Sequence, residues 1–188
     1  NVRLPSERAH GHQIAEVCRA LHELGHEVTV FAPYRRNSIL QTFQEYEGLP
    51  SSVHIVYGPR IDPIEAWWAP GVLGLWALNT LVRLFLRRQL RPDCFDLIYT
   101  RSPALLPTLL HTRIPVIIEL HKIPQRFLQR FIRHCRLCAR VVCLTRLMKE
   151  ELIALGLDAH HSIIEGDAVR LELFQHIVPR VLPATPST

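Results

Sequence analysis

The sequence predicts an α/β fold with a mainly parallel sheet and helices on both faces. Segments with helical periodicity alternate with short apolar runs over most of the 188 residues. The run Val116–Leu120 is almost wholly apolar, as is typical of a parallel strand that is buried on both faces. Gly25 and Gly156 each follow a helical segment, where glycine commonly ends a helix. Since 48% of the residues are hydrophobic, the chain can bury a core, and a disordered protein is excluded.

The first half supplies a helix and two strands. Residues 13–24 carry apolar side chains at helical spacing, and residues 27–33 follow at once as a buried strand. Residues 53–57 alternate like a second strand, and the polar segment 34–52 between them is predicted to be a loop. A helix that runs directly into a strand is half of a βαβ unit. We therefore expect a first strand upstream of Asn1, which the chain as given would be missing.

Residues 61–91 form the most unusual segment, because no charged residue occurs between Ala66 and Val82. The favoured interpretation is one or two helices packed on the sheet and broken near Pro70 and Gly71. The alternative is peripheral contact with a membrane, with tryptophans at the interface and arginines on lipid phosphates. A transmembrane span is disfavoured because proline and glycines interrupt the apolar run. The residues of this alternative are Trp67, Trp68, Trp76, Arg83, Arg87, Arg88 and Arg91.

The second half continues the alternation of strands and helices and ends in a tail. The expected strands cover residues 96–100, 116–120, 141–144 and 161–164. The expected helices follow Arg101, cover residues 125–138, and run from Thr145 to Gly156.

Charge and cysteine content exclude several classes of protein. The net charge is +5, but the arginines lie mainly on predicted helix faces without an aromatic-basic recognition motif, so we expect no nucleic-acid partner. The five cysteines are odd in number and lie mostly among apolar residues, which indicates reduced thiols in a cytoplasmic protein. The polar opening Asn1–Gly11 lacks the apolar core of a signal peptide.

Common cofactor and metal motifs are absent from the sequence. It contains neither GxGxxG nor GxxxxGK[ST], which argues against a dinucleotide site or a P-loop. Cys135 and Cys138 follow His134 in a CxxC pattern, but no second ligand pair has suitable spacing. We therefore expect neither a metal nor a bound cofactor.

His121 is the best candidate for chemistry. It follows the strand 116–120, and ligands of open α/β sheets bind at the carboxyl ends of the strands. Its neutral ring can donate or accept a hydrogen bond near pH 7, although a structural histidine bonded to a loop is almost as plausible. Glu119 is expected to point into the same crevice, and Arg101, after the adjacent strand, could meet a phosphate or a carboxylate. Gly11 begins the first helix, where backbone N–H groups favour an anion, but simple turn chemistry also explains it.

Five segments in this order resemble the N-terminal domain of GT-B-fold glycosyltransferases of glycosyltransferase family 4. The resemblance covers about residues 4–174 and implies a Rossmann-like, doubly wound domain on the acceptor side of a cleft. The segments are LPSERAHGHQIAEVCRALHELGHEVTVFAP, DLIYTRSP, IPVIIELH, RVVCLTRLMKEELIALG and GDAVRLELF.

The resemblance implies roles for individual residues. His10 and Gly11 would lie near the donor diphosphate or the transferred sugar, and His121 would line the catalytic site and contact that sugar. Arg101 and Thr145 would face the same cleft. The family transfers a sugar from a nucleotide-sugar donor with retention, usually without a metal. The acceptor would be a cell-envelope glycan or glycolipid, and the enzyme would lie in the cytoplasm or at the inner face of the membrane.

Two departures from the family pattern limit these expectations. Arg170 replaces the usual acidic residue of its segment, and the nucleotide-binding second domain is absent from the chain given. We expect residues 1–175 to form the N-terminal domain and residues 176–188 a tail or linker toward the absent domain. The isolated domain should then be inactive. The alternative is a non-catalytic Rossmann-like module that binds a phosphorylated ligand or a partner protein.

Overall fold

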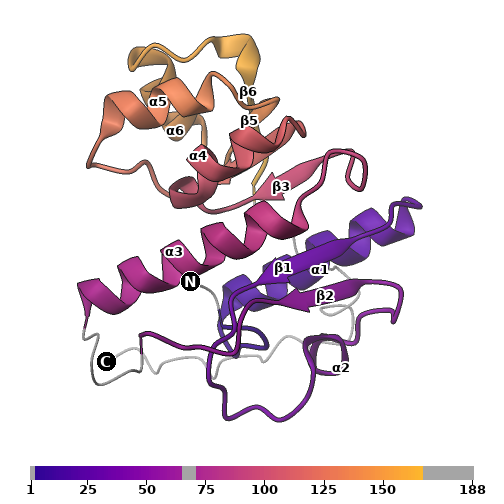
Figure 1. The fold of residues 1–188 in the computed structure, drawn as a ribbon. Coiled ribbons are helices and arrows are strands. Elements are labelled where there is room, and N and C mark those ends of the chain that lie inside the picture. The colour runs from indigo at the N-terminus through magenta and orange to yellow at the C-terminus, as the bar shows by residue number, and fades with distance from the viewer. Residues whose placement is uncertain (1–2, 65–70, 167–188) are drawn as a thin grey trace, which may run out of the picture.

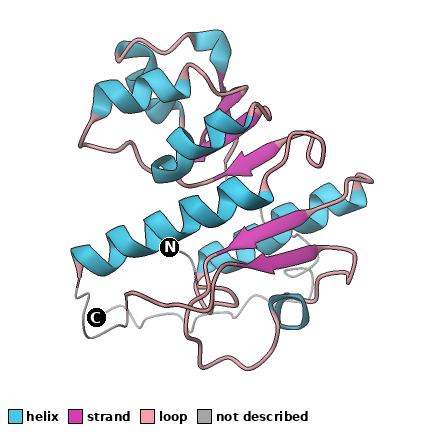
Figure 2. Cartoon of the chain, in the orientation of Figure 1, coloured by secondary structure: helices cyan, strands magenta, loops and turns pink. Residues whose placement is uncertain are grey.

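A computed structural model describes residues 3–64 and 71–166 of the chain. Strands alternate with helices, and helices flank the strands (Figures 1 and 2). The strands are β1 (Thr29–Ala32), β2 (His54–Tyr57), β3 (Ile98–Thr100), β4 (Val116–Leu120), β5 (Arg140–Cys143) and β6 (Ser162–Ile164). The α-helices are α1 (Ala9–Glu23), α2 (Phe43–Glu47), α3 (Val72–Gln89), α4 (Leu106–Leu109), α5 (Leu128–Cys135) and α6 (Arg146–Ala154). Single 3₁₀ turns cover Pro103–Leu105, Leu110–Thr112 and Ala159–His161.

All pairings between the described strands are parallel, which confirms the predicted α/β class. They form two groups rather than one continuous sheet: β1 pairs with β2, and β3 to β6 form a four-stranded sheet in chain order. No described strand pairs with both β1 and β3, so the two groups are not hydrogen-bonded to each other. The first strand expected upstream of Asn1 lies outside the described residues.

Helix α3 packs against both groups of strands and lies between them in Figure 1. The Phe85 ring of α3 meets Phe31 of β1 edge-on, with ring centroids 6.1 Å apart. Leu86 and Leu90 belong to the core of the four-stranded sheet. This confirms the favoured interpretation of a helix packed on strands, and the helix begins directly after Gly71. Trp67 and Trp68 lie outside the described residues, as does the tail 176–188.

The strand β4 is the centre of the larger core. Val116, Ile118 and Leu120 are at most 1% exposed and pack with side chains of the neighbouring strands and helices. Because side chains alternate along a strand, Glu119 points to the opposite face of the sheet from Ile118 and Leu120. The alternation therefore separates the apolar core from the one buried charge on this strand.

The prediction of a loop over residues 34–52 is wrong in one part, because the helix α2 forms within this segment. The side chain of Thr42 accepts a hydrogen bond from the backbone N–H of Glu45, and the Glu45 carboxylate accepts one from the backbone N–H of Thr42. Gly48, in the left-handed conformation with φ of 61°, ends the helix. This capping box satisfies two backbone donors that would otherwise lack partners.

Two other helices are shorter than predicted. The helix expected over residues 125–138 is α5, and it begins only at Leu128 because Phe127 takes a left-handed conformation with φ of 57°. After Arg101, the chain forms 3₁₀ turns around the one-turn helix α4 instead of a longer helix. Pro103 and Pro107 lack the backbone N–H that a continuous helix would use.

The five cysteines are free thiols, and all but Cys94 are buried. Burial raises the pKa of Cys135 to about 12 and that of Cys138 to about 11. Cys138 donates its S–H to the backbone carbonyl of His134. These thiols pack as small apolar side chains, and no group of residues that could hold a metal occurs within 3–64 and 71–166.

Candidate functional site

The carboxyl ends of β3, β4 and β5 lie side by side, because these strands are parallel neighbours. Arg101 follows β3 directly, His121 follows β4 directly, and Thr145 stands two residues after β5. The register pairs Thr100 with Ile118 and Cys143 with Leu120, so the three residues leave the sheet at one edge. The strand positions predicted for this edge are confirmed.

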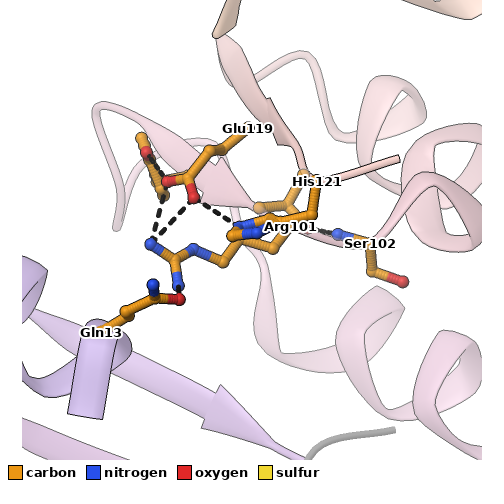
Figure 3. A network of polar contacts seen from close by, with 7 residues as sticks. Gln13, Arg101, Ser102, Glu119 and His121 are labelled. Carbon is orange, nitrogen blue, oxygen red and sulfur yellow. Dashed lines mark hydrogen bonds and ion pairs between the residues drawn. The ribbon is translucent and has the colours of Figure 1, made fainter. Parts of the chain in front are cut away.

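A buried carboxylate joins two of the predicted site residues. The side chain of Glu119 is only 5% exposed; Nη2 of Arg101 donates a hydrogen bond to its Oε2 at 3.0 Å and forms an ion pair with its Oε1 at 2.9 Å. Its Oε1 also lies 2.6 Å from Nε2 of His121. Figure 3 shows both side chains converging on the carboxylate. Glu119 is therefore saturated by protein partners rather than open to a ligand.

Tyr99 completes this network from the neighbouring strand. Its hydroxyl donates to Oε2 of Glu119. The register places Tyr99 beside Ile117, on the same face of the sheet as Glu119. Burial, followed by the hydrogen bond to Glu119, raises the pKa of Tyr99 well above its usual value. The hydroxyl therefore stays protonated near neutral pH and remains a donor.

His121 combines this anchor with access to solvent. Its Nε2 is engaged by Glu119, while 37% of the side chain is exposed. Within the described ranges, no hydrogen bond to its Nδ1 is found. A ring held at one nitrogen and free at the other can contact a ligand without losing its orientation.

The start of α1 faces this edge of the sheet. Oε1 of Gln13 accepts a weak hydrogen bond from Nη1 of Arg101 at 3.4 Å, as Figure 3 shows. Burial lowers the pKa of His10, and the positive charges of Arg8 and Arg101 add to this effect. Burial is the largest of these effects, followed by the charge of Arg8. His10 is therefore held in the neutral form at neutral pH.

His10 also carries an unsatisfied nitrogen. Its Nε2 is buried and has no hydrogen-bond partner among residues 3–64 and 71–166. A buried polar atom without a partner is costly, and such atoms in native proteins often await a ligand or a water molecule. His10 lies one turn before Gln13 in α1, and Gln13 contacts Arg101.

Gly11 lies in the first turn of α1, where the chain is tightly packed. A Cβ atom at this position would come within 3.1 Å of the backbone oxygen of Ser6 and 3.3 Å of the Ser6 Cβ. Packing alone therefore explains the glycine, so its presence does not by itself indicate a ligand.

Thr145 has a structural role that the sequence analysis did not assign. Its side chain accepts a hydrogen bond from the backbone N–H of Met148 and caps α6. Among residues 3–64 and 71–166, no hydrogen bond or ion pair joins Thr145 to Arg101, Glu119 or His121, although it shares their edge of the sheet. The structure thus brings together Arg101, Glu119 and His121, with His10 nearby, and leaves Thr145 as a neighbour.

Two members of the network, Tyr99 and Gln13, were missed by the sequence analysis. Tyr99 lies in a strand and Gln13 in a helix, and neither carries a motif. Their participation depends on the register between β3 and β4 and on the placement of α1. Tyr99 and Glu119 point to the same face of the sheet from neighbouring strands. The register between these two strands brings the side chains into contact.

A cavity of about 340 Å³ lies elsewhere, at the amino ends of the strands. Arg113 lines it three residues before β4, and Pro92 lines it before β3. It is therefore at the edge of the sheet opposite to His121. We locate the candidate site at the carboxyl edge because the buried charge network occurs there and contacts α1, the helix that carries His10.

A solved structure shares this fold over most of the chain. The structure of Anabaena Alr3699/HepE in complex with UDP and glucose is 18% identical and aligns with 90% of this chain at a TM-score of 0.50. The same protein in complex with UDP aligns at 0.49, also at 18% identity and with 90% of this chain. In both cases this chain spans 44% of the other chain's length. At this identity, the first of these matches supports the fold alone.

No curated protein matches the sequence significantly. The family described as Glycosyltransferase Family 4 matches residues 11–165, a range that contains every strand of the structure and both Arg101 and His121. This range covers well over half of the chain. The match agrees with the parallel α/β fold, and the chain belongs to Glycosyltransferase Family 4.

Proposed function

We propose that the chain is the acceptor-side N-terminal half of a retaining glycosyltransferase. In this proposal, residues 1–175 form one wall of the active-site cleft, and residues 176–188 lead to a second domain that binds most of the nucleotide. The whole enzyme transfers a sugar from a nucleotide-sugar donor to a cell-envelope glycan or glycolipid. Family membership supports the reaction class. The observation that carries the location of the site is His121, anchored by Glu119 at the carboxyl end of β4.

His121 is assigned to the catalytic site, where it contacts the transferred sugar. A rigid strand end supports this role because it holds the ring still while 37% of the side chain stays accessible. His10 is assigned to the donor side, and its partnerless Nε2 would bond a sugar hydroxyl or a phosphate oxygen. Backbone groups near Gly11 at the start of α1 would favour the diphosphate, because a helix N-terminus carries partial positive charge.

Arg101 and Thr145 complete the proposed cleft. The Arg101 side chain is 19% exposed, so part of the guanidinium can meet an acceptor or a phosphate while Nη2 stays on Glu119. Thr145 lies at the start of α6 on the same edge. Because the opposite charges of Arg101 and Glu119 offset each other, His121 and His10 are the groups whose hydrogen bonding can adapt to a substrate. The donor is a substrate of the whole enzyme, and the proposal needs no cofactor in this domain.

A uridine diphosphate sugar is the first donor to test. The solved structure of Anabaena Alr3699/HepE contains UDP and glucose, and it shares the fold of this chain at low identity. The donor series should include other nucleotides and sugars beside UDP-glucose.

We further propose that α3 lies on the inner face of the membrane, where a lipid-linked acceptor would be presented. Val72, Leu73, Trp76 and Leu84 are exposed large apolar side chains of this helix, and Trp76 is 68% exposed. Arg87 and Arg88 are exposed in its last turns. Exposed tryptophan and leucine beside arginine suit the boundary between lipid tails and phosphates. None of the helices in the described part of the chain has the length and hydrophobicity needed to cross a bilayer.

The direct test uses the full-length enzyme with a series of nucleotide sugars. The proposal predicts transfer to a polyprenyl-linked or glycan acceptor, with the product keeping the anomeric configuration of the donor, as NMR of the first-formed product would establish. Transfer with inversion would contradict the retaining mechanism. Absence of both transfer and donor hydrolysis with every nucleotide sugar would favour a non-catalytic binding module instead.

A further inference from the structure

The carboxylate of Glu119 has three donors and almost no contact with solvent. Its side chain is 5% exposed, and it meets the Tyr99 hydroxyl, Nη2 of Arg101 and Nε2 of His121. Removing a carboxylate from water is expensive unless hydrogen bonds and an opposite charge compensate for it. Within the described part of the chain its partners are all side chains, and two of them come from the neighbouring strand and the loop after it.

The chemistry of these partners fixes the hydrogen on His121. An ionised carboxylate can only accept hydrogen bonds, and a tyrosine hydroxyl and an arginine already donate to this one. The Nε2 atom, 2.6 Å from Oε1, must therefore carry a hydrogen to form a favourable contact. In a neutral imidazole only one nitrogen carries hydrogen, so Nδ1 is then an acceptor.

We propose that Tyr99 and Glu119 are positioning residues that hold His121 as a hydrogen-bond acceptor through Nδ1. The free nitrogen would then take a hydroxyl of the sugar and would not bind a phosphate oxygen, which offers no hydrogen near neutral pH. This inference rests on the proposed function, because it assigns the ligand of the same site. It adds Tyr99 to the site and changes Glu119 from a ligand-binding residue to one that acts through His121.

Tyr99 matters because it restrains the second carboxylate oxygen. Arg101 contacts both oxygens with the same nitrogen, so it does not fix the rotation of the carboxylate by itself. The tyrosine hydroxyl binds Oε2 from β3, while His121 lies on Oε1. Two partners on different oxygens define the carboxylate plane, and the plane in turn defines the direction of the imidazole.

The test measures the tautomer of His121 in this chain by imidazole ¹⁵N NMR at alkaline pH, where the rings are neutral. A His121→Gln variant identifies the signals among the 11 histidines. Hydrogen bonds to charged groups favour the engaged form by about tenfold or more. We therefore expect the His121 tautomer with hydrogen on Nε2 to exceed the tautomer with hydrogen on Nδ1 by at least tenfold. Comparable amounts of both forms, or an excess of the Nδ1–H form, would overturn the inference.

Two variants separate positioning from folding. Glu119→Gln keeps the shape of the side chain but can donate as well as accept, so the preference should fall to near equal populations. Tyr99→Phe should reduce the preference by a smaller factor, whereas Tyr57→Phe is the matched control, since both tyrosines lie in strands and are 39% and 38% exposed. A tautomer ratio in Glu119→Gln and Tyr99→Phe equal to that of the unmodified chain would refute the assignment.

The tautomer measurement does not depend on catalysis, so it remains informative if the proposed function fails. In an active full-length enzyme, Tyr99→Phe should lower kcat several-fold with little change in the donor KM, and Tyr57→Phe should leave both unchanged. An equal loss of stability in the two variants with equal kcat would contradict a positioning role for Tyr99.

Discussion

Nη2 of Arg101 lies 2.9 Å from Oε1 of Glu119 and ties the residue after β3 to the strand β4. The Arg101 side chain is 19% exposed and that of Glu119 is 5% exposed, so the pair is largely removed from water. Such a pair does not by itself make a protein more stable than an apolar pair would, but breaking it leaves a buried charge unpaired.

The first prediction concerns this pair. Arg101→Leu should lower the free energy of unfolding by about 3 kcal/mol, because Glu119 would stay buried without its cation. The double variant Arg101→Leu, Glu119→Leu should recover most of that loss, since no charge then remains unpaired. Urea unfolding of the two variants and the unmodified chain gives the comparison. If the double variant is as unstable as the single one or less stable, the buried-charge account is wrong.

The second prediction concerns stability against pH. The pKa of His10 is lowered from 6.5, mainly by burial and then by the positive charge of Arg8. Below pH 6.5 the unfolded chain binds a proton at His10 that the folded chain binds less readily. Stability from this group is therefore complete above pH 6.5 and is lost as the pH falls through and below that value. His134 acts in the same direction, because its pKa is lowered by burial and by Arg130.

The measurement is the free energy of unfolding between pH 7.5 and pH 5, in the unmodified chain and in His10→Gln. The variant should show a shallower decline toward low pH, with the remaining decline assigned in part to His134. His26→Gln, which removes an exposed histidine, is the control for a change of residue type. Parallel curves for His10→Gln and the unmodified chain would show that His10 is not held neutral by its surroundings.

The third prediction separates packing from ligand binding at Gly11. The added methyl group of Gly11→Ala would lie 3.1 Å from the Ser6 backbone oxygen. Overpacking costs about 1–3 kcal/mol, and the better helix propensity of alanine offsets about 1 kcal/mol of it. We expect a net loss of about 1 kcal/mol in thermal or urea unfolding without any ligand. An unchanged stability would mean that the backbone at Ser6 yields, and would leave ligand approach as the reason for glycine.

The fourth prediction tests the contact of α3 with the membrane. Leu73→Ser with Trp76→Ser should weaken binding to vesicles that contain anionic phospholipid, because both side chains are exposed and would enter the interface. Leu147→Ser is the control, since Leu147 is 73% exposed on α6. Co-sedimentation with the vesicles at low and high salt measures the binding of the unmodified chain, the double variant and the control variant. Binding that is equal in all three proteins would remove α3 as the membrane-contacting surface.

The same co-sedimentation experiment can test how far the arginine charges of α3 contribute to vesicle binding. Arg87→Glu with Arg88→Glu should weaken vesicle binding more than Arg130→Glu with Arg133→Glu, which changes the net charge equally on α5. The difference should shrink at high salt, because screening weakens the attraction of arginine to lipid phosphates. Equal losses from both pairs would indicate attraction by net charge rather than by α3.

Much of the fold follows from local patterns. The sequence alone predicts the alternation of strands and helices, the buried strand β4 and the glycine that ends α6, because each depends on residues that are neighbours in the chain. The capping box at Thr42 and Glu45 was equally local, so α2 could have been predicted from the spacing of those two residues and the glycine that follows. Phe127, by contrast, adopts a left-handed conformation that its residue type does not favour.

The candidate site was predictable only in part, for a different physical reason. The ends of β3 and β4 could be aligned from the parallel topology, which placed Arg101 and His121 at one edge. The saturation of Glu119 could not be predicted, because it depends on burial of the whole group and on the register that pairs Tyr99 with Ile117, two residues before Glu119. Likewise, the capping bond of Thr145 becomes apparent only once the start of α6 is known.

The most direct test of the central claim is the kcat of His121→Ala in the full-length enzyme, with the donor found active in the nucleotide-sugar series. If His121 contacts the sugar during transfer, kcat should fall on the order of 100-fold. The unfolding midpoint should change little, because the side chain is partly exposed. A kcat equal to that of the unmodified enzyme would contradict the placement of the active site at the end of β4.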